Sequence, residues 1–417
     1  METPADNKRQ TGFSAARFPN MIPIEEARTY VMDRCRPQPT VGTDVADALG
    51  LVTSADVIAN ESLPPFANTA MDGFAVRSAD LDTVPVRLEV IETIAAGHNP
   101  TREVGLGQAS RIMTGAPIPD GADAIVMVEK TSVDGDVVTI EAQVEPGNHI
   151  RPAGDDVKEG DLVFPAGTRL SAGHLGVLCS LGFQKIDTFP RLRVGVISTG
   201  DELVDDGGVL EPGQIRDSNR RTLLSLLSGD AFSPVDLGLV ADNELAIEEA
   251  LSQGAQDCDA VITSGGVSMG DFDYVKAVLD RIGDMRWMQI AIKPAKPLAF
   301  GTISGTPIFG LPGNPVSSMV SYELFARAGL RSMMGFREPI RPIIKGVAAK
   351  SMRRRADGKI HYVRVIAEQE NGTTVVYPVS GQGSHMLASM ARSNSLAVLP
   401  DGEGCEAGEQ VDVLLLD

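Results

Sequence analysis

The hydrophobic pattern is most regular between residues 191 and 335, where short apolar runs alternate with amphipathic segments. The runs LRVGVIS, FSPVDLGLV, DAVITS and TPIFGL have the length and apolar content of buried strands. A segment with the apolar spacing of a helix follows each run, such as ELAIEEALSQGA after FSPVDLGLV. Strands and helices that alternate in this way form a mostly parallel sheet covered by helices on both faces, so we predict an α/β domain over residues 191–335.

Outside this region the pattern indicates smaller domains and therefore a multidomain α/β protein. Short alternating runs such as RLEVIET, ASRIMT and DAIVMVE predict a β-rich domain inserted over residues 58–157. The flanking segments 20–57 and 158–190 are predicted to form one discontinuous mixed α/β domain. Residues 336–417 contain short strands with turns such as ADGK and ENGT, which indicates a small C-terminal β-barrel. Residues 1–18 are polar and are expected to be a disordered tail.

The composition is that of a soluble globular protein with enough apolar material for several cores. The 417 residues include 43% hydrophobic and 22% charged residues. A formal net charge of −19 and a pI near 4.7 disfavour a broad surface for nucleic acid or anionic membranes. An anionic ligand must therefore be met locally, by backbone N–H groups, a few basic side chains or a metal ion.

Cysteine usage and hydropathy suggest an intracellular protein. The four cysteines are far apart in sequence and form no CxxC pair, which disfavours a disulfide framework and a structural zinc site. No apolar run approaches the length of a membrane span, and the first 20 residues lack the apolar core of a secretion signal. We expect the protein in the cytoplasm, without nucleic-acid or membrane partners.

Four loops follow the carboxyl ends of the predicted strands, where open α/β sheets bind ligands. They are STGDEL (198–203), ADNE (241–244), SGGVSMGDFD (264–273) and LPGNPVS (311–317). Three of them carry carboxylates, namely Asp201 and Glu202, Asp242, and Asp271 with Asp273. Helix capping accounts for a single acid such as Asp271, but it does not require acids at three strand ends. We therefore expect the carboxylates to converge on one rim of the sheet.

Acidic side chains beside Gly- and Ser-rich backbone suggest a cation that bridges them to phosphate. Mg²⁺ commonly uses one or two protein carboxylates together with substrate phosphates and waters. The third loop would add close backbone approach through Ser264, Gly265 and Gly266. The pattern thus predicts a site for a phosphorylated ligand with Mg²⁺.

The fourth loop and the segment before it offer groups that could bind an anion. In LPGNPVS, Gly313 permits a tight turn, Asn314 can cap a helix, and Pro315 suits the first helical position. In QIAIKPAKPLAF (289–300), Lys293 and Lys296 each precede a proline, which predicts an extended, irregular segment. A well-capped helix and two surface lysines are the simpler alternatives for each feature taken alone.

Turns in the inserted domain are also candidates. Asp72 in PPFANTAMDGFAVR and Thr114 in RIMTGAPIPDGADAIV each stand before a glycine, and Asp156 lies in RPAGDD. Turn formation alone explains each of them, so only their occurrence together favours a site. The basic run SMRRR (351–355) is most simply a solvated strand or turn.

Several common chemistries are excluded by spacing. The chain has no GxxxxGK[ST] phosphate loop, no GxGxxG after a suitable strand, no GxSxG elbow and no HExxH motif. The residues therefore indicate a multidomain α/β protein that handles a phosphorylated small molecule with Mg²⁺. They do not identify the substrate.

Seven motifs in order give a specific resemblance that the spacing alone does not. PPFANTAMDGFAVR, RIMTGAPIP, STGDEL, TSGGVSMGDFDYVK, IKPAKP, GLPGNPVS and SGQGSHMLASMARSNSLAVLP are similar to motifs of the molybdopterin molybdenumtransferase family, called MoeA in bacteria. The family includes the E domains of gephyrin and of plant molybdenum-cofactor proteins. The resemblance runs from about residue 20 to the C-terminus and implies that the α/β domain has the molybdopterin-binding fold.

The resemblance also implies an activity and an assembly. Members of the family insert molybdate into adenylated molybdopterin and release AMP, with Mg²⁺ required. They are L-shaped homodimers of four-domain subunits, with the site in a cleft between the α/β domain of one subunit and the β-rich insertion of the other. A molybdopterin adenylyltransferase is the implied upstream partner.

The family's functional residues carry over by position in the motifs. The residues that match its important acids and threonine are Asp72, Thr114, Asp156, Glu202, Asp242 and Asp273. Of these, Glu202, Asp242 and Asp273 are expected at the Mg²⁺ and nucleotide end. The expected ligands of substrate are Ser264, Gly265, Gly266, Lys293, Lys296, Pro312, Gly313, Asn314, Pro315, Arg364 and Ser384, with both lysines, Arg364 and Ser384 on the molybdate side.

The chain departs from the family pattern at three positions, and two other functions stay open. Ala67, Phe74 and Ala295 stand where Asp, Tyr and Gly are common, and the change at Ala295 matters most if its loop needs a positive φ. Residues 191–334 alone resemble the molybdopterin adenylyltransferase fold, although that enzyme is a single domain. A non-catalytic molybdopterin-binding or scaffold role is the other alternative.

Overall fold

The computed structural model describes residues 21–230, 232–266 and 274–416, which form two compact units. The first unit comprises Met1–Val41, Gly50–Val52 and Phe189–Asp417, and the second comprises Gly42–Leu49 and Thr53–Thr188. Each unit has hydrophobic clusters of its own. Among the described residues, no helix is both long enough and apolar enough to cross a membrane.

The first unit contains the predicted α/β sheet. Its six strands lie in the order β16, β13, β17, β21, β20 and β18. The first four are parallel to one another, and β20 and β18 are antiparallel to their neighbours, so the prediction of a mostly parallel sheet is confirmed. The strands are β13 (Arg193–Thr199), β16 (Ser233–Val240), β17 (Ala260–Ser264), β18 (Asp284–Gln289), β20 (Pro297–Ile303) and β21 (Thr306–Leu311).

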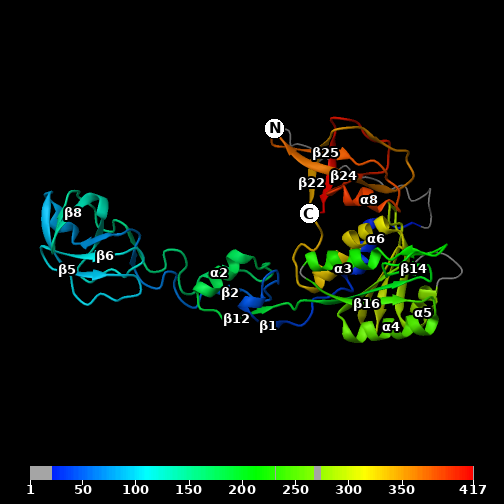
Figure 1. The fold of residues 1–417 in the computed structure, drawn as a ribbon, viewed down its shortest axis with the longest axis horizontal. Helices are drawn as coiled ribbons and strands as arrows, with labels where there is room; N and C mark the ends of the chain where they lie inside the picture. Colours follow the sequence, from blue (N-terminus) through cyan, green and yellow to red (C-terminus); the bar gives the residue numbers. More distant parts are fainter. Residues whose placement is uncertain (1–20, 231, 267–273, 417) are drawn as a thin grey trace, which may run out of the picture. The chain divides into compact units, whose positions relative to one another are not determined.

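Helices cover both faces of this sheet (Figure 1). α3 (Asn219–Gly229) and α6 (Pro315–Ser321) share one hydrophobic cluster with strand residues, and α4 (Glu244–Asp257) and α5 (Tyr274–Ile282) share another. α6 continues through a π-helical turn, Tyr322–Ala326, into α7 (Arg327–Met333). A two-stranded ribbon of β14 (Leu203–Val204) and β15 (Ile215–Arg216) follows β13 along the chain.

The first helix belongs to a different unit from the one the sequence suggested. α1 (Ile24–Met32) begins directly after Pro23 and buries Ile24, Ala27 and Val31 in the hydrophobic cluster of the first unit. The sequence pattern had grouped it with the discontinuous mixed domain, because helical spacing does not show which sheet a helix packs on.

The register of the strands places one further segment at the carboxyl edge of the parallel strands. Ser264 pairs with Leu311, so β17 and β21 end together. β20 runs antiparallel to β21 and therefore begins at this edge, and β18 ends there because Gln289 pairs with Pro297. The connection 290–296, which holds Lys293 and Lys296, thus lies at the same edge as the four loops. PLAF, predicted as irregular, is instead the start of β20.

The C-terminal part of the first unit is a small closed barrel, as predicted. Its strands follow the order β24, β25, β22, β28 and β26, and pairing of β24 with β26 closes the ring. β19 (Ile292–Lys293), from the edge of the α/β sheet, pairs with β24, so a short ladder joins the two parts. The elements are β22 (Ile343–Ala348), β23 (Met352–Arg353), β24 (Ile360–Glu370), β25 (Thr373–Pro378), α8 (Leu387–Ala391), β26 (Ser395–Leu399), β27 (Gly404–Cys405) and β28 (Gln410–Leu415).

The basic run of the barrel has a structural role that the sequence did not show. The side chain of Arg354 is only 5% exposed and donates to the carbonyl oxygens of Leu399 and Pro400 and to the carboxylate of Asp401. Arg353 is exposed and pairs with Glu406. The expectation of a wholly solvated run is therefore wrong for Arg354.

The second unit holds the β-rich sheet and three small ribbons. The sheet has the strand order β7, β4, β6, β5, β9 and β8. Its strands are β4 (Gly73–Val76), β5 (Val86–Ile94), β6 (Gln108–Ile112), β7 (Ala124–Met127), β8 (Thr131–Asp134) and β9 (Val137–Ile140). The ribbons pair β1 (Val41–Asp44) with β12 (Lys185–Thr188), β2 (Val57–Ile58) with β11 (Leu162–Phe164), and β3 (Asn68–Thr69) with β10 (Ile150–Arg151), and α2 spans Ala172–Ser180.

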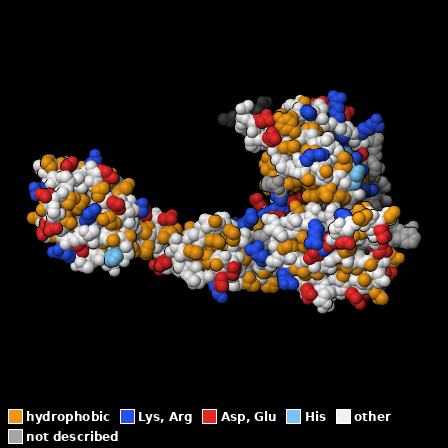
Figure 2. Space-filling model, viewed as in Figure 1, with side chains coloured by type: hydrophobic (Ala, Val, Ile, Leu, Met, Phe, Trp, Pro, Cys, Tyr) orange, Lys and Arg blue, Asp and Glu red, His pale blue; other side chains and the backbone are white. Residues whose placement is uncertain are grey.

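Acidic and basic side chains are interspersed over the visible face of the first unit (Figure 2).

Candidate functional site

The acids of the first two loops meet at the carboxyl edge of the sheet. The backbone N–H of Asp242 donates to Oδ1 of Asp201 over 3.0 Å. Burial raises the pKa of Asp242, and the negative charges of Asp201 and Glu202 raise it further. The loops after β13 and β16 therefore bring three carboxylates together, and the convergence with the acids of the third loop stays a prediction.

A buried ionic network holds the first loop and the start of α3. Asp217 accepts hydrogen bonds from Oγ of Ser198 at 3.1 Å and from Nε of Arg220 at 3.0 Å. Arg220 also pairs with Asp205 and Asp236, so it links the loop after β13 to strand β16. Burial by itself disfavours the charged guanidinium, yet the hydrogen bonds from Arg220 to Asp236 and Asp217 raise its pKa above the ordinary value. The network fixes the backbone from which Glu202 projects.

The third loop begins with two glycines whose conformations other residues rarely adopt. Gly265 has φ +98° and Gly266 has φ +68°. A Cβ atom on Gly266 would overlap the side chain of Val275, and the N–H of Gly265 donates to the carbonyl of Leu311 at 3.1 Å. This backbone conformation therefore requires glycine at both positions. Asp271 and Asp273 lie outside the described residues, so the roles predicted for them stay predictions.

One side chain that the sequence did not single out links the third and fourth loops. Nδ2 of Asn219 donates to Oγ of Ser264 at 2.8 Å and to the carbonyl oxygen of Gly313 at 2.7 Å. Asn219 is the first residue of α3, where an asparagine is usually taken as an ordinary helix-start residue. The sequence does not show that Asn219 joins the two loops, because Ser264 and Gly313 are distant from it along the chain.

The fourth loop differs from the prediction at its cap. Pro312 is buried, Gly313 and Asn314 are exposed, and Pro315 is the first residue of α6, as expected. Asn314 occupies the N-cap position, but its side chain makes no capping hydrogen bond. The expected capping role of the Asn314 side chain is therefore wrong.

The C-terminal barrel contacts this helix start through the predicted substrate residue Ser384. The backbone N–H of Val316 donates to the carbonyl of Ser384 at 3.1 Å. That donor is consequently used within the protein and is not available to an anion. The contact nevertheless places the GQGSH loop beside the fourth loop.

The lysine loop has the conformation that the family glycine would favour. Ala295 is buried and has φ +72°, in the left-handed region that favours glycine. Lys293 and Lys296 on either side are exposed, and the N–H of Ile290 donates to the carbonyl of Lys296 at 2.7 Å. The side chains of Lys293 and Lys296 thus lie at the same edge as the acidic loops. The alanine between them adopts a positive φ that is strained for this residue.

Arg364 lies on the face of β24 that points away from the barrel core, next to the GQGSH loop. Its Nη2 atom donates to the carbonyls of Gly381 at 2.8 Å and Gly383 at 3.2 Å, and its side chain is fully buried. Burial lowers the pKa of Arg364. Its Nε and Nη1 atoms have no partner in the described structure, and such unpaired buried donors suit an oxyanion.

In the second unit, two of the three candidate residues form a pair. Oδ1 of Asp72 accepts hydrogen bonds from the backbone N–H and the hydroxyl of Thr114, both at 2.7 Å. These two hydrogen bonds, the backbone one first, lower the pKa of Asp72 below its ordinary value. Asp156 is exposed, and its backbone N–H donates to the carbonyl of Leu63 at 3.0 Å.

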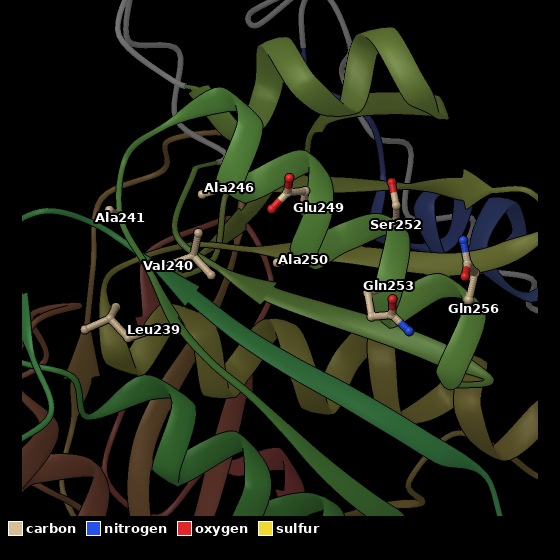
Figure 3. Close-up of a pocket in the computed structure, with 9 residues that line it drawn as sticks. All are labelled: Leu239, Val240, Ala241, Ala246, Glu249, Ala250, Ser252, Gln253 and Gln256. Atoms are coloured by element: carbon tan, nitrogen blue, oxygen red, sulfur yellow. The ribbon is translucent and has the colours of Figure 1, made fainter.

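A hollow of about 770 Å³ lies beside the second loop, but its lining does not suit an anionic ligand (Figure 3). It is bordered by the end of β16 and by α4, and it holds the carboxylate of Glu249 with the polar side chains of Ser252 and Gln253. No lysine or arginine is among its described lining residues. The candidate site is therefore the loop edge and not this hollow.

No group of three or more metal-binding side chains is preassembled in residues 21–230, 232–266 and 274–416. Mg²⁺ does not need one, because it commonly takes one or two carboxylates and completes its shell with phosphates and waters. Of the three carboxylates predicted to bind Mg²⁺, the structure describes Glu202 and Asp242, which lie near each other, and their role at a metal ion stays a prediction.

Comparison with known proteins identifies the family. Three family models match in order: the MoeA N-terminal region (domain I and II) over residues 22–182, a probable molybdopterin binding domain over 195–332, and the MoeA C-terminal region (domain IV) over 346–416. A molybdopterin molybdenumtransferase of Haemophilus influenzae is 37% identical over 94% of this chain and 98% of its own. The chain belongs to the MoeA family of molybdopterin molybdenumtransferases. It is therefore an enzyme, a transferase of molybdenum cofactor biosynthesis.

Two further comparisons agree with this family. A molybdopterin molybdenumtransferase 2 of Mycobacterium tuberculosis is 39% identical over 92% of this chain and 96% of its own. The crystal structure of a molybdopterin biosynthesis MoeA protein from Pyrococcus horikoshii has a TM-score of 0.79 at 29% identity, over 95% of this chain and 100% of the other. The resemblance given by the seven motifs is thus confirmed over nearly the whole MoeA fold.

The strained alanine gives a stability prediction. Replacing Ala295 by glycine removes a buried methyl group but relieves the positive φ, so we expect A295G to change the free energy of unfolding by less than about 0.5 kcal/mol. Ala299 is equally buried in β20 and has no positive φ, so A299G should lower the free energy of unfolding by at least about 1 kcal/mol. Urea denaturation of both variants measures the difference. Equal losses for the two variants would show that Ala295 is not strained.

The raised pKa of Asp242 gives a pH prediction. The folded protein keeps this proton to a higher pH than the unfolded chain, so ionisation weakens folding as the pH rises through the interval above the ordinary value of 3.8. We expect D242N to be more stable than the wild type at about pH 7, by a few tenths of a kcal/mol, with no gain at about pH 4. Urea denaturation across this range tests it, with D136N, on an exposed turn, as the control. A D242N protein that is less stable at neutral pH would contradict the assignment.

Proposed function

We propose that this chain inserts molybdate into adenylated molybdopterin and releases AMP in a reaction that requires Mg²⁺. The observation that carries the proposal is the composition of one sheet edge. Paired acids from the first two loops, a glycine backbone from the third and two lysines from the 290–296 connection gather there. At such an edge the acids can hold Mg²⁺ against the nucleotide phosphates, and the lysines can bind molybdate.

The separation of charges matters because both reactants are anions. Molybdate is a dianion, and it must approach a pyrophosphate linkage against electrostatic repulsion. Lys293, Lys296 and the unpaired donors of Arg364 would supply positive charge for the oxyanion. Ser384 would join them, since it follows Gly383, whose carbonyl accepts from Arg364. Local cations are needed here, since the chain as a whole is strongly acidic.

Glu202 and Asp242, with Asp273 outside the described residues, would hold Mg²⁺ at the nucleotide end. The ion would supply stabilisation of the charge that develops on the departing AMP phosphate. The protein groups then orient the nucleotide. The pKa of Asp242 is raised by burial and by neighbouring negative charges, and a bound cation would offset that repulsion. The glycines of the third loop and Pro312, Gly313, Asn314 and Pro315 of the fourth would place backbone against the substrate.

The candidate residues of the second unit would complete the site from another subunit. Asp72 and Thr114 form an ordered pair and Asp156 is exposed, so all three are available to a ligand. We propose a homodimer in which these residues serve the loop edge of the partner chain. A molybdopterin adenylyltransferase would supply the adenylated substrate.

An assay with adenylated molybdopterin, Mg²⁺ and molybdate tests the proposed function. We expect wild-type protein to release AMP only when molybdate is present, and D242A to lower the rate by at least about 100-fold because a nucleotide-end carboxylate is lost. D136A, on an exposed turn, is the control with an unchanged rate. Formation of the adenylate from ATP would instead indicate an adenylyltransferase, and binding without turnover a scaffold. Unchanged release by D242A would remove this residue from the mechanism.

Mixing variants tests the homodimer. A site shared between subunits predicts that D72A and D242A are each inactive alone, but regain about a quarter of wild-type AMP release when co-expressed, since half the dimers then hold one intact site. Co-expression of D72A with a D72A/D242A double variant is the control and should recover nothing. Sedimentation of the wild type as a monomer, or failure of the mixed pair to recover, would contradict the shared site.

A further inference from the structure

The bridge made by Asn219 fixes the direction of its own amide. The carbonyl oxygen of Gly313 can only accept a hydrogen bond, so the atom at 2.7 Å from it must be the amide nitrogen. The same nitrogen lies 2.8 Å from Oγ of Ser264 and uses its second hydrogen there. Both hydrogens of the Asn219 amide are thus committed, one to each loop.

The direction of the amide decides the direction of the Ser264 hydroxyl. A serine hydroxyl has one hydrogen and two acceptor lone pairs, so an oxygen that accepts from Asn219 keeps its hydrogen for another group. Among the described residues, Asn219 is the hydrogen-bond partner of this hydroxyl. Ser264 is therefore oriented as a donor at the end of β17, where the loops gather.

Asn219 is itself held rigidly, so the orientation is built into the fold. It is followed by Arg220, whose backbone N–H and Nε atom donate to Asp217 at 3.2 and 3.0 Å within the buried ionic network. The two acceptors of Asn219 lie at the ends of neighbouring strands, since Ser264 ends β17 and Gly313 follows β21 by two residues. The N–H of Gly265 also donates to the carbonyl of Leu311, which joins these ends. Asn219 therefore donates to two loops that the strands already hold side by side, and it leaves the Ser264 hydroxyl free to act as a donor.

We propose that Asn219 is a positioning residue that aims the Ser264 hydroxyl, as a hydrogen-bond donor, at a phosphate oxygen of the substrate's nucleotide half. Phosphate oxygens only accept hydrogen bonds, and the neighbouring acids of the first two loops offer no donor for them. This inference rests on the proposed function, since it names the part of the substrate that meets the third loop.

A double-mutant cycle with ADP as the probe tests it on the full chain. If Asn219 acts through Ser264, N219A should weaken ADP binding by about three- to tenfold in the wild-type background and by less than about twofold in the S264A background. N219D has the shape of asparagine but accepts the serine hydrogen, so it should weaken binding more than N219A, by at least about tenfold. Isothermal titration calorimetry gives these ratios, and N219D also serves if N219A does not fold.

The matched control is Asn394 in the barrel. Its Oδ1 accepts from the N–H of Ala367 at 2.8 Å and its Nδ2 donates to the carbonyl of Ala367 at 3.0 Å, so it also joins two segments. N394A should leave ADP affinity within about twofold of the wild type. Equal losses from N219A with and without Ser264, or weaker loss in N219D than in N219A, would overturn the inference and leave Asn219 as a structural staple.

The outcome is separable from that of the proposed function. ADP binding that shows the expected coupling, together with wild-type protein that releases no AMP in the presence of molybdate, would refute the reaction and keep the phosphate assignment. Molybdate-dependent AMP release without the coupling would keep the reaction and refute the role of Asn219. Wild-type protein that does not bind ADP would also overturn the phosphate assignment.

Discussion

The buried ion pair between Arg220 and Asp217 is the interaction on which the candidate site depends. Both side chains are almost fully buried, and Arg220 has further partners in Asp205 and Asp236. Removing one member of a buried charge cluster costs about 3–5 kcal/mol because the others lose their compensation. The cluster joins strands β13 and β16, the β14–β15 ribbon and the start of α3. The same buried charges therefore hold the elements that carry Asp201, Glu202, Asp242 and Asn219.

Much of the architecture follows from the sequence for local reasons. The period of apolar residues separates strands from helices, and parallel strands necessarily share a carboxyl edge, which is why Asp201 and Asp242 could be expected together. The small barrel follows from short strands and turns in the same way. The unit to which α1 belongs does not follow, because an amphipathic helix shows an apolar face but not the surface that covers it.

The parts of the site that escaped prediction depend on long-range geometry. Asn219 and Gly313 are 94 residues apart, and an asparagine at a helix start has many commoner explanations than a bridge between loops. The burial of Arg364 and of Arg354 likewise depends on contacts between segments far apart in sequence, since arginine is usually exposed. The motif resemblance supplied Arg364 by position, but only the structure shows its unpaired donors. Conversely, Asn314 was predicted to cap α6, but its side chain makes no capping hydrogen bond. The local sequence could not show this, since it does not reveal that the N–H of Val316 donates to the distant Ser384.

The pair of Asp72 and Thr114 has a consequence for binding entropy. Both hydrogen bonds end on Oδ1, so the carboxylate has lost its rotational freedom before any ligand arrives. An exposed side chain that is ordered only on binding reduces affinity by the freedom it gives up, commonly about 0.5–1.5 kcal/mol for a flexible one. For Asp72 this rotational freedom is already lost when the protein folds. The carboxylate is preorganised, and a molecule that meets it gains the contact without having to order this side chain.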